Sequence, residues 1–180
     1  NGITLNIKNS GDIHSWIGNN IIDGNDFGYF NDSDANKTGK SIPTLSENQF
    51  INQTDANLTD ATQTGFPIYL GGTAEPVYAS NSFANNKRRA IALGGWWGAD
   101  AILKAVNGDS NVPFSGKVFP YVVIADMTAG TTANITIPAS MFIKFDKDKK
   151  ITVNGGLMLQ SHTGQESTFT SFKDDVYDDT

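Results

Sequence analysis

The clearest pattern in the chain is an alternation of apolar and polar residues near its start. Ile3, Leu5 and Ile7 are separated by single polar residues over positions 3–8. Side chains of a strand point alternately to its two faces, so this period of two is typical of a strand with one buried face. We predict a strand here, with its apolar row available to complete a sheet of its own chain or of a neighbouring subunit.

A second region, residues 117–125, is apolar at odd and even positions alike. Such a pattern indicates a central strand covered by other layers on both faces. Shorter runs elsewhere predict further strands, at 12–17, 66–70, 76–80, 88–93, 133–137, 141–145, 150–153, 156–160 and 168–172. The charged segment 146–149 reads as the tip of a hairpin between two of them.

One helix is expected, at about 98–107. Asp100 would lie in its first turn, Ile102, Ala105 and Val106 would form a short apolar stripe, and Gly108 would end it.

Residues 18–65 show no clear period and are rich in Asn, Asp, Thr, Gly and Ser. This segment is too long for a plain loop, so it contains short strands of unresolved phase or forms a polar surface excursion. No internal repeat is evident. The pattern predicts a single β domain over 1–180, an antiparallel β-sandwich or jelly roll with the excursion at about 18–65.

The composition agrees with a β protein and argues against several partners. Charged residues make up 18% of the chain and the net charge is −6, which disfavours a nucleic-acid binder because phosphate contacts need a basic face. No apolar run is long enough to span a membrane. The chain has no cysteine, which excludes disulfides and thiolate metal sites.

Candidate chemistry is limited to oxygen-rich segments. Asp32, Asp34 and Asn36 carry hard oxygen ligands at alternate positions, as the start of a calcium loop does. Lys37 and Pro43 stand where an EF-hand needs Gly and Glu, so the motif predicts a calcium site of another kind. Further oxygen-rich segments lie at 107–111, 146–148 and 174–179. No catalytic motif is present, and we expect a protein that is not an enzyme.

Trp96 and Trp97 lie between glycines. Exposed flat rings beside Asn and Asp bind sugars by stacking, whereas buried tryptophans belong to the core. The pair is therefore a candidate contact surface for a glycan or peptide, with a core role as the alternative.

The acidic, cysteine-free, Asn- and Thr-rich composition resembles secreted surface modules, such as ligand-binding domains of bacterial adhesins or subunits of extracellular filaments. This likeness involves no specific motif. With Asn1 as the first residue, we expect a processed or excised chain and an extracellular or cell-surface location. The first hypothesis is a structural or adhesive module that assembles with copies of itself, forming a filament by N-terminal strand addition. The alternatives are a calcium-assisted glycan- or peptide-binding domain of an adhesin, and a virion jelly-roll protein.

Overall fold

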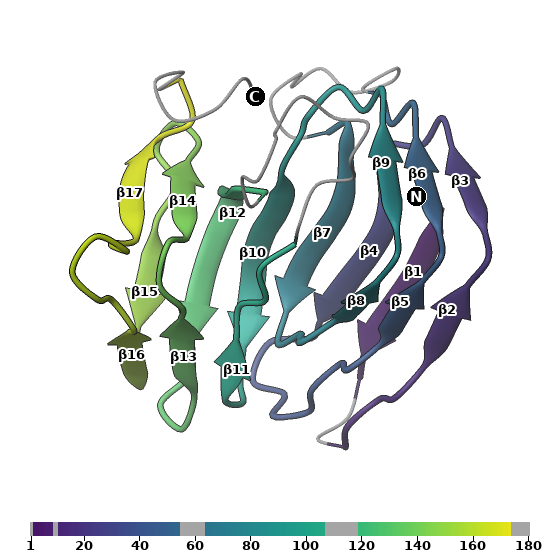
Figure 1. Cartoon of the computed structure of the whole chain (residues 1–180). Helices are drawn as coiled ribbons and strands as arrows, with labels where there is room; N and C mark the ends of the chain where they lie inside the picture. The colour runs from purple at the N-terminus through teal and green to yellow at the C-terminus, as the bar shows by residue number, and fades with distance from the viewer. Residues whose placement is uncertain (1, 9–10, 55–63, 107–118, 174–180) are drawn as a thin grey trace.

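The structure, a computed structural model, describes residues 2–8, 11–54, 64–106 and 119–173. Within these residues the protein is all-β and contains no helix (Figure 1). The strands of the first half are β1 (Ile3–Ile7), β2 (Trp16–Gly18), β3 (Ile21–Asp23), β4 (Phe27–Ser33), β5 (Thr44–Ser46), β6 (Gln49–Ile51), β7 (Phe66–Gly72), β8 (Val77–Ala79) and β9 (Ser82–Ala84). The second half adds β10 (Ile91–Trp97), β11 (Ala101–Ile102), β12 (Tyr121–Ala129), β13 (Asn134–Ile137), β14 (Phe142–Phe145), β15 (Ile151–Val153), β16 (Gly156–Leu159) and β17 (Thr168–Ser171).

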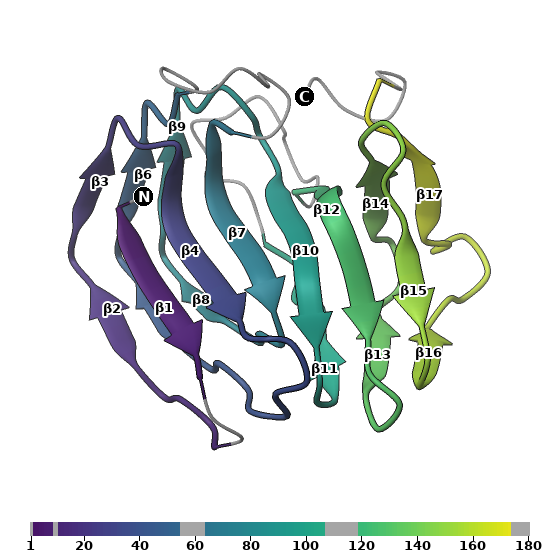
Figure 2. The ribbon, with the colours of Figure 1, turned by 180° about the vertical axis from the view of Figure 1, so that it is seen from behind.

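The strands form a parallel β-solenoid. The long sheet has the order β1-β4-β7-β10-β12-β14-β17. β14 pairs with the first half of β12 and β15 with its second half, so β14 and β15 lie in the same coil. Three shorter sheets have the orders β2-β5-β8, β3-β6-β9 and β11-β13-β16. Each pairing between these strands is parallel, so the chain completes one coil and returns to lie beside the coil before it (Figures 1 and 2).

The core fills the inside of the coils. In the long sheet, residues that are paired between neighbouring strands lie on top of one another. One inward row is thereby formed by Tyr29, Ile68, Ile91, Tyr121 and Ile143. All five are buried in the same apolar cluster. A second stack, Phe50 on Phe83, has ring centroids 5.3 Å apart and nearly parallel planes.

The predicted antiparallel sandwich or jelly roll is wrong. Side chains alternate between the two faces in parallel and antiparallel strands alike, so the alternation gave the strands but not their direction. The predicted hairpin at 146–149 is wrong for the same reason. β14 and β15, on either side of it, both pair in parallel with β12 and therefore run in the same direction.

The predicted helix at about 98–107 is also wrong. Ala101 and Ile102 form β11, which pairs in parallel with β13. Ala101 and Leu103 are buried while Ile102 is exposed, which is the period of a strand. Contacts with the next coil outweigh the weak local preference for a helix. Residues 107 and 108, at the end of that expected helix, lie outside the described residues.

The expected central strand is confirmed in its central placement and burial, but its bounds differ from the predicted 117–125. The strand is β12, which begins at Tyr121 and runs on to Ala129, with β10 on one side and β14 and β15 on the other. Val122 and Val123 point to opposite faces and are both fully buried. Residues 117 and 118 lie outside the described part of the chain.

The aperiodic stretch 18–65 contributes β3, β4, β5 and β6, which fits the first of its two interpretations. Three of these strands have only three residues, too few to show a period. No helix among the described residues has the length and apolar character needed to cross a membrane.

Candidate functional site

One candidate surface is the N-terminal end of the solenoid, formed by the first coil. β1 pairs in parallel with β4 of the same chain, with Ile3 opposite Tyr29 and Leu5 opposite Asn31. Ile3 and Leu5 are only partly buried against the core, and Ile7 occupies the last position of the strand. The other edge of β1 pairs with no strand among the described residues, so its peptide groups are open to a further strand.

Two ladders of amide side chains run through the first three coils. Asn20, Asn48 and Asn81 form the first: the Asn20 side-chain amide donates to Asn48 Oδ1 at 2.9 Å, and that of Asn48 donates to Asn81 Oδ1 at 3.0 Å. The Asn48 amide also donates to the Ile17 carbonyl at 2.8 Å. Each ladder residue thereby satisfies peptide groups at a corner between two short strands, where no regular sheet pairing reaches.

The second ladder lies five positions further along each coil. The Asn25 backbone N–H donates to Gln53 Oε1 at 2.9 Å, and the Gln53 backbone N–H donates to Asn86 Oδ1 at 3.1 Å. The side chains of Gln53 and Asn86 then donate to the carbonyls of Ile22 and Phe50. At both ends of the β3-β6-β9 sheet, a ladder side chain therefore accepts a hydrogen bond from the coil before it and donates one to a backbone carbonyl of that coil.

Both ladders end with unused acceptors on the first coil. In each inner coil, the ladder oxygen accepts a backbone N–H from the coil before it, as Asn48 Oδ1 does from Asn20. No donor among the described residues reaches the side-chain oxygens of Asn20 and Asn25. These two residues line a pocket of about 320 Å³ together with Gly2, Ile3, Ile21, Ile22 and Asp23. The first coil thus presents the same groups that the inner coils use for stacking.

The opposite end of the solenoid has an uncovered apolar interior. Leu157 and Leu159 on β16 pair with the buried Ile135 and Ile137, and therefore face inward. They are nevertheless 42% and 49% exposed, and Phe169 on β17 is 40% exposed. β16 and β17 lie at the far end of the solenoid from β1 and β2 (Figures 1 and 2). Inward-facing side chains are this exposed because no described coil stacks on them.

The two tryptophans have different environments. Trp97 is fully buried in the core, and its Nε1 donates to the Gly94 carbonyl at 2.9 Å. It therefore presents no surface to a ligand. Trp96 points outward, is partly buried, and donates through Nε1 to the Lys37 carbonyl at 3.0 Å. Only Trp96 keeps the predicted role as a contact residue.

The predicted calcium segment lies close to Trp96. Asp32 is in β4 and its Oδ1 accepts the Ser33 backbone N–H at 2.8 Å, while Asp34 and Asn36 are exposed in the loop that leads to Lys37. Among the described residues, no group of three or more His, Cys, Asp or Glu is placed to hold a metal ion. Of the further oxygen-rich segments, 107–111 and 174–179 lie outside the described residues, whereas 146–148 lies within them.

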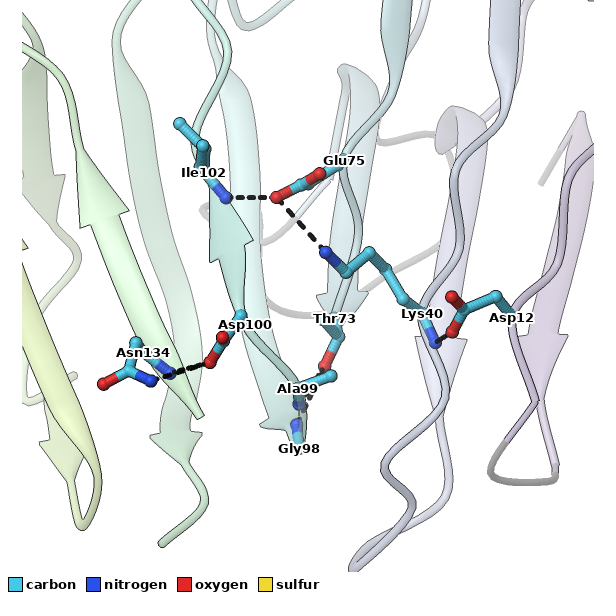
Figure 3. A network of polar contacts seen from close by, with 9 residues as sticks. All are labelled: Asp12, Lys40, Thr73, Glu75, Gly98, Ala99, Asp100, Ile102 and Asn134. Atoms are coloured by element: carbon cyan, nitrogen blue, oxygen red, sulfur yellow. Dashed lines mark hydrogen bonds and ion pairs between the residues drawn. The ribbon is translucent and has the colours of Figure 1, made fainter. Parts of the chain in front are cut away.

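A polar network links the coils at the corner that follows the long sheet (Figure 3). The Lys40 backbone N–H donates to Asp12, and the Lys40 ammonium lies 3.4 Å from Glu75. Glu75 in turn accepts the Ile102 backbone N–H at 2.6 Å, so four coils are joined in sequence. One coil further, hydrogen bonds from the Asn134 side chain and backbone hold the pKa of Asp100 below its ordinary value. Each carboxylate is occupied with neighbouring coils, which suits a structural role.

A ten-residue repeat underlies the ladders and was missed in the sequence. The repeat aligns residues 16–25, 44–53 and 77–86. Each copy consists of two similar halves. In each half, an inward-facing apolar residue is followed two positions later by a residue with left-handed backbone conformation, and the next residue is Asn in the first half and Asn or Gln in the second. Glu47, Ser80 and Asn52 are among the left-handed residues, with φ of 57°, 54° and 54°. Asn at positions 20, 48 and 81 was the available signal. The spacings of 28 and 33 residues are unequal, and this hid the repeat.

Comparison with known proteins finds no match: no family model, no curated protein and no solved structure is significantly similar to this chain.

Proposed function

We propose that this chain is a non-enzymatic structural module whose solenoids stack end to end, in the manner expected of an extracellular filament or adhesive surface protein. The observation that carries the proposal is that both ends of the described part of the solenoid expose groups that the inner coils use for stacking. Asn20 and Asn25 offer ladder acceptors at the first coil, and Leu157, Leu159 and Phe169 leave an apolar interior uncovered at the last.

The parallel arrangement makes the two ends compatible. All coils run in the same direction, so a second copy placed further along the axis brings its β1 beside β17 with the strands still parallel. Stacking then resembles the addition of one more coil, and it is heterologous, so copies can continue to add. Here β1 remains in its own sheet and offers its free edge, which differs from the exchange of a strand between subunits.

The expected affinity is modest. Completing the burial of three half-exposed apolar side chains contributes on the order of 3 kcal/mol, at roughly 25 cal/mol per Å² of apolar surface. Association of two proteins costs an estimated 4 kcal/mol or more in lost freedom of motion. The remainder must come from strand pairing, the ladder acceptors and the partly buried Ile3 and Leu5. We therefore expect assembly that depends on protein concentration.

Sedimentation velocity over a range of concentrations, with electron microscopy of the largest species, tests the proposal. A double variant, Leu157→Asp with Leu159→Asp, blocks the last coil. The matched control is Met158→Asp: Met158 lies between them on β16, is 56% exposed and points outward. The blocked variant should stay monomeric where the control still assembles.

A mixing experiment tests the head-to-tail geometry. Ile3→Asp with Leu5→Asp blocks the first coil, and this protein alone should also be monomeric. Mixed with the variant blocked at the last coil, it should form dimers and nothing longer, because each pair has one compatible junction and two blocked ends. A wild-type protein that is monomeric at every concentration, or a Met158→Asp control that loses assembly equally, would refute end-to-end stacking.

A further inference from the structure

A row of three outward-facing side chains begins at Trp96 and crosses three consecutive coils. Parallel pairing aligns Trp96 of β10 with Thr128 of β12, and Thr128 with Thr152 of β15. Their inward neighbours Trp97 and Met127 are buried in the core, which fixes the three side chains on the outer face. We call Trp96, Thr128 and Thr152 the outer stripe; β10, β12 and β15 lie side by side in Figure 2.

The Trp96 ring is held in place before any ligand arrives. Its Nε1 donates to the Lys37 carbonyl, which belongs to a loop from two coils earlier. Part of the ring lies against Gly130, where a Cβ atom would be 2.8 Å from it, and its Nε1 would be 2.7 Å from a Cβ at Gly98. Both glycines therefore make room for the ring, and a fixed aromatic side chain loses little entropy when it binds.

The groups around this ring are those that hydroxylated ligands use. Thr128 and Thr152 carry hydroxyls and are partly exposed, and Asp34 and Asn36 are exposed in the loop that leads to Lys37. An indole ring offers an apolar face with dispersed negative charge, whereas hydroxyl, amide and carboxylate groups accept or donate hydrogen bonds. An apolar face with hydroxyls at its rim, as on a sugar, matches both kinds of group at once.

We propose that the outer stripe binds an extended, uncharged polysaccharide that runs parallel to the solenoid axis. Neighbouring strands are about 4.8 Å apart, so successive side chains of the stripe are spaced at a step close to the length of one sugar unit. The protein carries a net charge of −6, which disfavours anionic polymers. This binding activity goes beyond the structural role proposed above and does not depend on it.

An extended peptide fits the same place less well. Peptides that bind sheets as an added strand need unpaired peptide groups at an edge. β10 is paired with β7 on one side and with β12 on the other, and β12 is paired with β10 and β15. The backbone hydrogen bonds of β10 and β12 are therefore already used within the solenoid. Among the described residues, β15 pairs with β12 alone, but a strand added at its other edge would lie along β15 and would not reach Trp96.

Affinity electrophoresis through gels containing soluble neutral polysaccharides, namely a β-glucan, a mannan and a dextran, tests the proposal directly. The protein is the variant with Leu157→Asp and Leu159→Asp, so that binding is measured without stacking. At least one polymer should retard it. Trp96→Ala should weaken that interaction at least tenfold, and Thr128→Val with Thr152→Val should weaken it several-fold. Trp96→Phe should retain part of it.

Trp16→Ala is the matched control, because Trp16 is 65% exposed on β2, outside the outer stripe. It should leave binding unchanged. If Trp96→Ala fails to fold, the threonine variants and Trp96→Phe decide the question. Absence of binding to every neutral polymer, equal loss in Trp16→Ala, or binding of a polyanion or an extended peptide instead would each overturn the proposal. None of these results alters the sedimentation test of stacking.

Discussion

Asn48 donates its side-chain amide to Asn81 Oδ1 in the next coil at 3.0 Å, and the Asn48 backbone N–H donates to the same oxygen at 3.0 Å. One oxygen thus accepts two hydrogen bonds from a single residue of the coil before it. The Asn20–Asn48 pair repeats this geometry, at 2.9 and 3.2 Å. The corner is therefore defined by side chains as much as by the backbone.

Replacing Asn48 by Ala should destabilise the protein by about 3 kcal/mol. Asn48 is fully buried, and its loss leaves the Ile17 carbonyl and the Asn20 amide without their partner. Each buried polar group left unsatisfied costs about 1–3 kcal/mol. Urea denaturation measures the change.

Asn20→Ala is the comparison for this ladder prediction. Asn20 ends the ladder and is only partly buried, so its loss should cost clearly less than the loss of Asn48. Equal effects of the two substitutions would show that the ladder is not what stabilises the corner.

Trp97→Ala should cost about 3–5 kcal/mol, the usual cost of truncating a large buried aromatic side chain. Trp97 is fully buried, whereas Trp96 is partly exposed, so Trp96→Ala should cost less. Thermal and urea unfolding of the two variants give the comparison. A larger loss of stability from Trp96→Ala would contradict the assignment of Trp97 to the core.

The protein should lose stability at alkaline pH. Burial raises the pKa of Tyr29 to about 12, and burial together with the charge of Asp32 raises the pKa of Tyr69 to about 12. Burial also raises the pKa values of Tyr78 and Tyr121. The unfolded chain ionises near pH 10, so stability is complete below pH 10 and falls as the pH rises from 10 towards 12.

A shift of two pKa units corresponds to about 2–3 kcal/mol for each tyrosine by pH 12. Urea unfolding at a series of pH values should show this fall. Tyr29→Phe combined with Tyr69→Phe should make it shallower, because two ionising groups are removed. An unchanged slope in the double variant would assign the alkaline loss to other groups.

The alternation of Asp32, Asp34 and Asn36 continues to predict calcium binding. An ion that binds only the folded state raises the melting temperature by mass action. The melting temperature in millimolar calcium should therefore be higher than in chelator, and Asp34→Asn should reduce this difference. Identical melting curves in calcium and in chelator would remove this prediction.

The short-range pattern of the chain determined where several strands lie. The alternation at 3–8 predicted β1, and the two-faced apolar run at 117–125 predicted the buried β12, because inward and outward positions are set by the strand itself. The alternation at 133–137 likewise corresponds to β13. Burial of Trp97 but not of Trp96 follows from the same alternation once β10 is known to continue through both.

Strand direction was decided only by the tertiary structure. Residues alternate with a period of two whichever way the neighbouring strand runs, and parallel pairing requires a long connection back to the start. Here those connections contain three-residue strands such as β5 and β6, too short to show a period. Asn48 and Gln53 read as ordinary turn residues in the sequence. They become ladder positions because coils of unequal length bring them into register with Asn20 and Asn25, a relation that exists only in the folded chain.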